Sequence, residues 1–230
     1  MPNKHLICIS SAICTVNTPL DYTETRSFFT HTQRYEQSLQ TIEKIREKIP
    51  NAYIVFMEGT KIDTSMIEVI KAKADYFFDA SSLKWVEDNV NSPYKSMGEI
   101  STLVAYLLSN HFNEHKNNFI SLSKISGRYL PNASFQLNII PKKIIAKVSF
   151  NPQYHSVEYM STLFYTVPVD MFDGFIQACI NCYNDEETRN GKPIECILLK
   201  NLKKINLDIY NTNILNVEGE YGPWGGYVCH

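Results

Sequence analysis

The chain contains 230 residues, of which 44% are hydrophobic, 20% charged and 12% aromatic. This balance predicts a folded globular protein and argues against a disordered, collagen-like or small disulfide-scaffold chain. Lysine and arginine total 22 against 24 aspartate and glutamate residues, so no overall positive charge favours binding to nucleic acid or to an anionic membrane. An anion would have to be held by a few placed cations. The five arginines are the first candidates: Arg26, Arg34, Arg46, Arg128 and Arg189.

Cysteine usage favours a reducing compartment. Most of the six cysteines lie in apolar runs, where a reduced thiol behaves as a small hydrophobic group, and this pattern predicts a cytoplasmic protein. The pair Cys179-x-x-Cys182 could form half of a metal site, but no second pair follows at zinc spacing. Because no apolar run approaches about 18 residues and no secretory signal opens the sequence, neither secretion nor a membrane span is expected.

Apolar runs of strand length alternate with helical patterns over the first half of the chain. The clearest helical pattern is an apolar stripe that runs from Tyr35 to Ile49 at spacings of three and four residues, and Pro50 ends it. Strands that alternate with helices predict an α/β fold with a doubly wound, mostly parallel sheet covered on both faces. The elements expected here are strands at 5–13, 52–57, 75–79 and 118–124, and helices at 31–49, 64–73 and 95–110.

The second half has a mixed α+β pattern. Short apolar segments at 135–140, 144–150 and 161–167 are followed by helices at 170–184 and 194–203 and by a last strand at 208–217. No repeat or low-complexity linker separates the two halves. The sequence therefore predicts a single domain over residues 1–230, with a change of character near residue 130.

Ligands bind open α/β sheets beyond the carboxyl ends of the strands, so the loops after the predicted strands hold the candidate site residues. Ser11 and Ala12 follow the first strand, and Glu58 ends the second. Arg26 lies in the long loop after the first strand, and Arg34 lies in the first turn of the next helix. This segment could hold a diphosphate, although neither GxGxxG nor GxxxxGK[ST] is present. The alternative is that both arginines are solvated surface charges.

The KSMGE segment opens the helix at 95–110 with Lys95, Gly98 and Glu99. It follows the loop of the third strand, at the predicted binding edge. A carboxylate early in a helix also suits the helix macrodipole, so Glu99 has a structural explanation as well.

The run FISLSKISGRY is the most informative segment. An apolar strand ends in Lys124, Ser126, Gly127 and Arg128, which places two cations and a glycine-permitted turn at the mouth of the sheet. Two such cations could neutralise a pyrophosphate without a metal. The alternative is a strand end with solvated charges.

Two later segments carry carboxylates. Glu195 follows a Gly/Pro loop and starts an apolar helix, where it could act as a general base or only as a partner of the helix dipole. The run VEGEYGPWGGY combines Glu218, Glu220 and Trp224 with several glycines. Aromatic faces beside carboxylates are typical of a sugar site. The alternative is a chain end made of turns.

Taken in order, these motifs resemble the compact GT-A-type glycosyltransferases that lack a clear metal motif, such as those of large DNA viruses and bacterial surface-polysaccharide loci. The resemblance covers about residues 5–130 and rests on SSAI, the QRYEQSLQTIEKIR helix, KSMGE and above all KISGRY. It implies a GT-A-like, Rossmann-type fold in which residues 1–130 bind a nucleotide-sugar donor and residues 131–230 bind the acceptor. For a viral chain, the cytoplasm would be that of the host.

In GT-A enzymes the strand equivalent to 119–124 normally ends in Asp-x-Asp, which holds a divalent cation such as Mn or Mg on the diphosphate. This chain has the letters SKIS there, which puts a metal in doubt and makes Lys124 and Arg128 the candidate charge-neutralising groups. The acidic position that faces the acceptor in the family matches Glu195, although Cys196 stands where a second acid is usual. His230 could correspond to the C-terminal histidine that contacts the diphosphate or metal in many members.

These observations predict a glycosyltransferase that moves a sugar from a nucleotide-diphosphate donor to an acceptor hydroxyl, with Glu195 as general base and Glu218 and Glu220 in reserve. The alternative is a non-catalytic nucleotide- or glycan-binding module of the same fold, and a nucleotidyltransferase is less favoured because a Gly-rich phosphate loop is absent. No nucleic-acid partner, membrane span or metal ligand is expected. The expected donor-binding residues are Ser11, Ala12, Arg26, Arg34, Glu58, Lys95, Gly98, Glu99, Lys124, Ser126, Gly127, Arg128, Trp224 and His230.

Overall fold

A computed structural model describes residues 4–151, 157–220 and 225–229 of the chain. The predicted site residues Trp224 and His230 lie outside these described residues.

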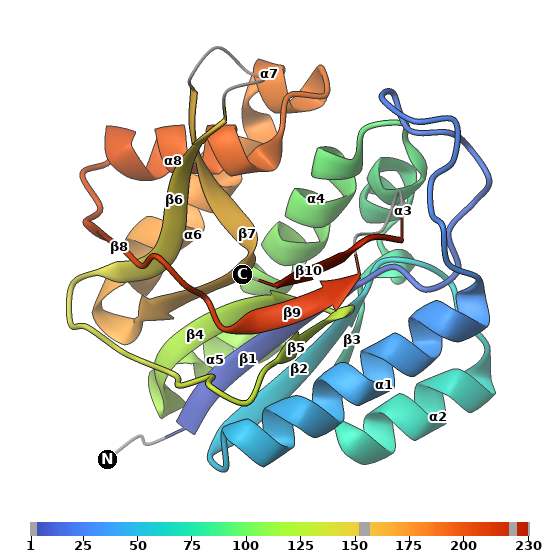
Figure 1. The fold of residues 1–230 in the computed structure, drawn as a ribbon, viewed down its shortest axis with the longest axis horizontal. Helices are drawn as coiled ribbons and strands as arrows, with labels where there is room; N and C mark the ends of the chain where they lie inside the picture. Colours follow the sequence, from blue (N-terminus) through green and yellow to red (C-terminus); the bar gives the residue numbers. More distant parts are fainter. Residues whose placement is uncertain (1–3, 152–156, 221–224, 230) are drawn as a thin grey trace.

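A seven-stranded sheet forms the centre of the fold, in the order β3-β2-β1-β4-β7-β6-β8. Every neighbouring pair in it is parallel except those of β7, which runs antiparallel to both β4 and β6. The prediction of an α/β fold with a mostly parallel sheet is confirmed, and the arrangement is Rossmann-like (Figure 1). The strands are β1 (Lys4–Ser11), β2 (Ala52–Glu58), β3 (Tyr76–Asp79), β4 (Phe119–Ser126), β6 (Ile144–Asn151), β7 (Val157–Pro168) and β8 (Ile209–Asn211).

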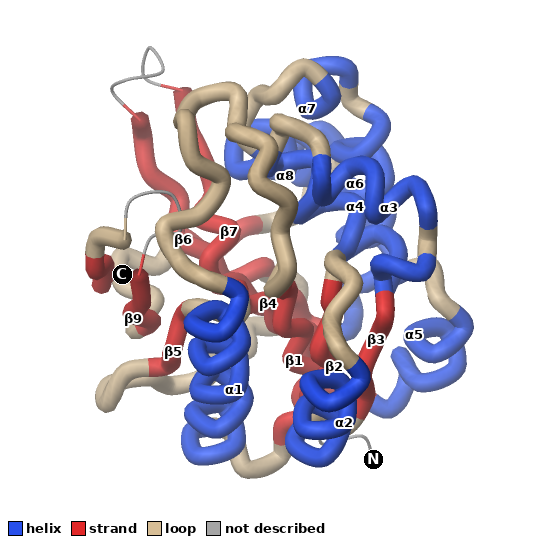
Figure 2. The backbone as a smooth tube through the Cα atoms, turned by 90° about the vertical axis from the view of Figure 1, so that its right-hand side faces the viewer, coloured by secondary structure: helices blue, strands red, loops and turns tan. Residues whose placement is uncertain are grey.

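Helices cover both faces of this sheet (Figures 1 and 2). The alternation of β1 explains why: Leu6 and Cys8 face one apolar core, while Ile7 and Ile9 face the other. One face carries α1 (His31–Lys48) and α2 (Thr64–Lys73), and the other carries α4 (Lys95–Leu107), α5 (Asn110–His115), α6 (Phe172–Asn184) and α8 (Ile194–Lys204). The shorter helical segments are α3 (Lys84–Asn91), α7 (Glu186–Arg189), and the single turns Ala80–Ser82, Lys116–Asn118 and Val169–Met171.

Helix α1 begins and ends close to where its sequence pattern predicts. Thr30 forms a capping box with Gln33, in which the Gln33 N–H donates to the Thr30 hydroxyl (3.2 Å) and the Thr30 N–H donates to Gln33 Oε1 (2.9 Å). The predicted apolar stripe is confirmed, because Ile42 and Ile45 are buried in the core beneath the sheet. This start places Arg34 in the first turn, at the end of the sheet where β1 terminates.

A second, three-stranded sheet lies beside α1. It consists of β5 (Tyr129–Pro131), β9 (Val217–Glu220) and β10 (Tyr227–Cys229), in the antiparallel order β10-β9-β5. The Thr41 hydroxyl of α1 donates to the carbonyl of Tyr129 (3.2 Å). Gln37 of α1 donates to Glu220 of β9 (2.8 Å).

Three sequence expectations differ from the structure. Residues 135–140 form no strand, because Phe135 turns into the core as part of a loop and the segment pairs only through an isolated bridge of Ile140. The strand expected at 208–217 is divided between β8 and β9, since the chain leaves the sheet edge after Asn211 and Asn216 adopts a left-handed backbone conformation (φ 55°). Helix α3 lies in an expected loop, where Val86 and Val90 pack against α4. Among the described residues, no helix combines the length and apolar character needed to cross a bilayer.

We expect the Gly219→Ala variant to be destabilised, because an added Cβ would overlap the carbonyl oxygen of Arg128 and lie 2.9 Å from the Tyr129 ring. Overpacking of this kind costs about 1–3 kcal/mol. Gly226→Ala is the control, since a Cβ there meets no heavy atom within 4 Å. Urea unfolding of both variants measures the difference. Equal unfolding free energies would contradict the close approach of β5 and β9.

Candidate functional site

A pocket lies at the carboxyl ends of β1 and β4. These two strands are neighbours, and the strand order reverses between them, because β2 and β3 continue on one side of β1 and β4 lies on the other. Such a switch point is where open α/β sheets bind ligands. The predicted residues that line the pocket are Ser11, Ala12, Arg26, Arg34, Lys95, Gly98, Glu99, Ser126, Gly127, Arg128 and Glu195.

Four predicted residues of the described chain do not line the pocket. Lys124 lies behind its wall, in contact with Glu99. Glu58 is buried at the end of β2. Glu218 and Glu220 lie on β9 of the small sheet, where Glu220 accepts a hydrogen bond from Gln37. The position of the two β9 carboxylates makes them poorer candidates for chemistry in the pocket than Glu195.

Arg34 is a buried cation at the pocket wall. The residue is 7% exposed, and within the described chain its guanidinium makes no hydrogen bond or ion pair. The buried Glu58 carboxylate is near enough to favour its charged form. Burial and the neighbouring charge of Arg128 lower its pKa to about 9, so it remains charged at neutral pH. A buried charge without a protein partner is costly. Arg34 therefore gives the pocket wall a buried positive charge whose guanidinium donors have no acceptor among the described residues.

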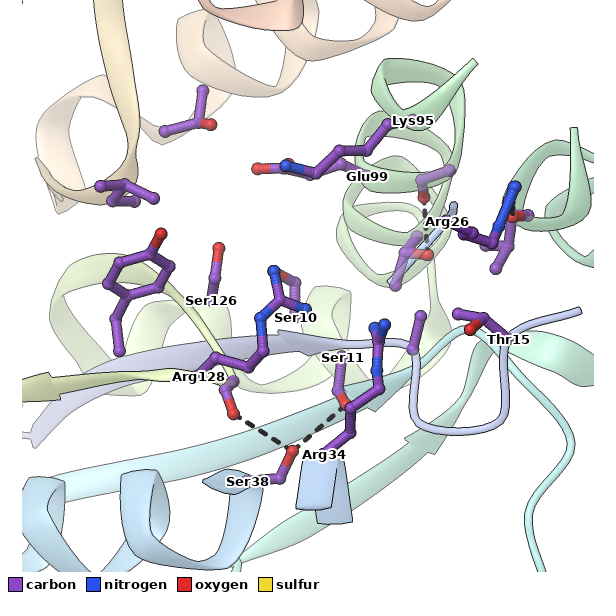
Figure 3. A pocket seen from close by; sticks show the side chains of 18 of the residues that line it. Ser10, Ser11, Thr15, Arg26, Arg34, Ser38, Lys95, Glu99, Ser126 and Arg128 are labelled. Atoms are coloured by element: carbon purple, nitrogen blue, oxygen red, sulfur yellow. Dashed lines mark hydrogen bonds between the residues drawn. The ribbon is translucent and has the colours of Figure 1, made fainter. Parts of the chain in front are cut away.

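Arg128 is placed beside Arg34 by the turn after β4 (Figure 3). The Gly127 N–H donates to the carbonyl of Ser10 (2.9 Å), and the Ser38 hydroxyl donates to the carbonyl of Gly127 (3.2 Å). A Cβ at Gly127 would lie 3.1 Å from the Ser38 hydroxyl, so glycine allows this close approach. The predicted turn at Gly127 thus places Arg128 next to Arg34 at the switch point of the sheet.

Lys124 and Glu99 form a buried ion pair on the other side of the pocket. The Lys124 ammonium is 1% exposed and contacts the Glu99 carboxylate. It also donates to the Thr162 carbonyl (2.6 Å) and to the Ser126 hydroxyl (3.0 Å). The pair therefore joins β4, α4 and β7, and its charges are satisfied by protein groups.

The pKa values of the two pocket carboxylates, Glu99 and Glu195, are shifted in opposite directions. Burial alone would raise the pKa of Glu99, but the charges of Lys124 and Lys95 lower it below its usual range. The pKa of Glu195 is raised by burial and by the negative charge of Glu99. Glu99 is therefore a fixed carboxylate, whereas Glu195 can exchange a proton closer to neutral pH. Opposed shifts of this kind are characteristic of paired acid and base groups.

Lys95 lies near both carboxylates. It is half-buried at the start of α4, and its side chain extends into the pocket on the same side as Glu99 (Figure 3). Burial lowers its pKa, and the Glu99 carboxylate opposes that shift. With Arg26, Arg34 and Arg128 it gives the pocket wall more positive than negative side chains, as expected for a site that takes a polyanion.

Arg26 anchors the loop between β1 and α1. Its guanidinium donates to the carbonyls of Val90 (2.7 Å) and Ser92 (2.9 Å) at the C-terminal end of α3. The same loop is held there by the Asp21 N–H, which donates to the carbonyl of Pro93 (3.2 Å). Arg26 lines the pocket as predicted. Its guanidinium N–H groups, however, donate to backbone carbonyls, so its observed role is to hold the loop against α3.

Glu58 has a similar supporting position. Its Oε1 accepts hydrogen bonds from the backbone N–H groups of Ile13 (3.0 Å) and Thr60 (2.9 Å). Burial raises its pKa, and these hydrogen bonds oppose the shift. Glu58 thus fixes the chain that follows β1, behind the pocket, and its predicted role in ligand contact is not supported by its placement.

Several pocket residues were missed by sequence reasoning, notably Ser38 and Thr162. Ser38 lies one helical turn after Arg34 on α1, so helical spacing could have identified it. Thr162 has no comparable signal, because its place depends on an irregular pairing of β7.

The residues present do not fit a divalent cation. Mg²⁺ and Ca²⁺ require several oxygen ligands, but the Glu99 carboxylate is engaged by Lys124, and the ammonium groups of Lys95 and Lys124 lie near Glu195. Among the described residues, no three His, Cys, Asp or Glu side chains gather as a metal set. The position that the resemblance assigns to metal ligands is occupied by a lysine.

Comparison with protein-family models and with curated protein sequences finds no match to this chain.

We expect Arg34→Met to weaken binding of inorganic pyrophosphate about 10- to 100-fold, because the variant loses charge-assisted hydrogen bonds to the anion. Its unfolding free energy should not fall, since the arginine is a buried charge without a partner in the described chain. Isothermal titration and urea unfolding measure the two effects. The exposed Arg189→Met is the matched control, and wild-type affinity in Arg34→Met would contradict an anion site here.

We expect Lys124→Met to destabilise the protein by about 3–5 kcal/mol at neutral pH, because it leaves the Glu99 carboxylate buried without its partner. The Lys124→Met, Glu99→Gln double variant should recover part of this loss. Because the folded pKa of Glu99 is lowered, the stabilisation in the wild type is present above the unfolded pKa and is lost as pH falls through the folded pKa. Urea unfolding across pH tests both points, and additive effects of the two substitutions would be contrary to the pairing.

Proposed function

We propose that the protein is a glycosyltransferase of GT-A type that transfers a sugar from a nucleoside-diphosphate donor to an acceptor hydroxyl without a divalent cation. The observation that carries the proposal is the buried Arg34 beside Arg128 at the switch point of the sheet. A diphosphate is the anion that two adjacent guanidinium groups hold well. The sugar and the acceptor rest on the sequence resemblance.

The pocket supplies both parts of such a reaction. Arg34 and Arg128 would bind the diphosphate, and Glu195 would accept the proton of the acceptor hydroxyl. The acceptor oxygen forms a bond to the anomeric carbon, and the bond from that carbon to the diphosphate oxygen breaks, so that the diphosphate leaves with the electron pair. Fixed cations stabilise this leaving group as its charge develops. A base with a raised pKa suits proton transfer near neutral pH.

Glu195 is favoured as the base over the two reserve carboxylates. It lines the pocket, whereas Glu218 and Glu220 do not. Glu99 also lines the pocket, but its pairing with Lys124 makes it a weak base. Position and environment therefore select the same residue.

The direct test is incubation with a panel of nucleotide sugars and candidate acceptors, with detection of the released nucleoside diphosphate in the presence and absence of EDTA. Turnover that EDTA does not reduce supports the proposal. Nucleotide binding without turnover would favour the non-catalytic binding module instead. The absence of both binding and turnover over the whole panel would refute the proposal.

We expect Glu195→Gln to lower kcat by about 10²- to 10⁴-fold while nucleotide affinity is retained, because the amide cannot accept the acceptor proton. In the wild type, kcat should fall as pH drops through the raised pKa of Glu195, which lies above the ordinary value of 4.5. Rate measurements across pH test both points. The exposed Glu114→Gln, remote from the pocket lining, is the control, and an unchanged rate in Glu195→Gln would remove this residue from the role.

A further inference from the structure

Strand β7 has a bulge at the pocket. It pairs with β4 from Phe164 to Pro168, and its register with β6 shifts between Tyr165 and Met160. Residues 161–163 consequently have no pairing partner in either ladder of the described sheet. Bulges beside functional sites turn a side chain toward a ligand, and both Thr162 and Leu163 line the pocket.

The bulge is held by the buried ammonium of Lys124. The Thr162 carbonyl, which has lost its place in the ladder, accepts a hydrogen bond from Lys124 Nζ (2.6 Å). The ion pair with Glu99 fixes the position of this ammonium. The irregular backbone of β7 is thus stabilised by a side chain of the neighbouring strand.

The hydroxyl that the bulge presents reaches Glu195. Thr162 Oγ1 donates to Glu195 Oε1 at 3.2 Å. The same hydroxyl also lies within hydrogen-bond reach of the Glu99 carboxylate, so Thr162 stands between the two carboxylates. The start of α8, which carries Glu195, is itself tied to α4 by the Ile194 N–H donating to the Ser96 hydroxyl (3.1 Å). A carboxyl group that accepts one hydrogen bond at a fixed oxygen presents its other oxygen in a defined direction.

We propose that Thr162, presented by the β7 bulge and held by Lys124, is a positioning residue that orients the Glu195 carboxylate toward the reacting hydroxyl. This inference rests on the proposed function, because the orientation matters only if Glu195 accepts a proton. It adds a residue that no sequence motif identifies.

The charged neighbours of Glu195 determine how the proposal is tested. Lys95 and Glu99 face it from α4, and Lys124 faces it from β4. The thiol of Cys182 on α6 also lies within its electrostatic influence. The thiol of Cys196, the next residue on α8, is a further neighbour. All of these groups remain in a Thr162 variant, but the hydroxyl also bonds Glu99, so a change in Glu195 is assigned to its own lost hydrogen bond only when the Glu99 midpoint is followed as well.

The test uses Thr162→Val, which removes the hydroxyl and keeps the shape, and Thr162→Ser, which keeps the hydroxyl. Ser161→Ala is the control, because it removes a hydroxyl from the same bulge. The titration midpoints of the Glu195 and Glu99 carboxyls are followed together by ¹³C NMR, and transfer rates are measured across pH. If valine is not accepted in the bulge, Thr162→Ala removes the same hydrogen bond.

We expect Thr162→Val to raise the titration midpoint of Glu195 and to lower kcat about 10- to 100-fold with KM for the donor unchanged, since a hydrogen bond to the charged form is lost. Thr162→Ser and Ser161→Ala should keep the wild-type midpoint. An unmoved midpoint in both Thr162→Val and Thr162→Ala would overturn the proposal. A moved midpoint in a protein that turns over no sugar donor would uphold the contact and refute only the proposed function.

Discussion

The site depends on one buried interaction, the ion pair between Lys124 and Glu99. The Lys124 ammonium lies where β4 and β7 stop pairing, and it replaces the missing ladder donor at the Thr162 carbonyl. A buried pair of this kind adds little net stability, because the desolvation of two charges offsets their attraction. Its effect here is to specify structure: it fixes the end of β4, the first turns of α4 and the bulge of β7 relative to one another. Each of these elements contributes a wall of the pocket.

The pocket is lined by cations and by carboxylates. Arg34 and Arg128 form one wall, from α1 and the turn after β4, and Glu99 lies across the space from them (Figure 3). Glu195 also lines the pocket. The Lys124 charge keeps Glu99 ionised, and the Glu99 charge in turn raises the pKa of Glu195. Lys124 therefore acts on the pKa of Glu195 in two ways: its own charge lowers that pKa, and the Glu99 carboxylate that it keeps ionised raises it.

Sequence reasoning identified the parts of this site that are local. The apolar stripe of α1 and its start placed Arg34, and the KISGRY run placed Arg128, since each depends on a few neighbouring residues. Pairing between distant segments was not predictable in this way. Composition suggested that Glu218 and Glu220 lie in the site, but the pairing of β9 with β5 places them outside the pocket lining. The bulge at Thr162 likewise follows from the registers of two ladders.

The two arginines are held in place before any ligand arrives. Arg128 leaves a backbone confined between close approaches at Gly127 and Gly219, and Arg34 leaves the first turn of a helix that Thr30 caps. The cost of burying Arg34 and of ordering both side chains is therefore met during folding. An anion that enters recovers the unmade hydrogen bonds of a cation already aimed at it, without reorganising the wall. Preorganised charge of this kind also stabilises a leaving group, so the buried positive charge that is costly to fold is the one that would be useful in transfer.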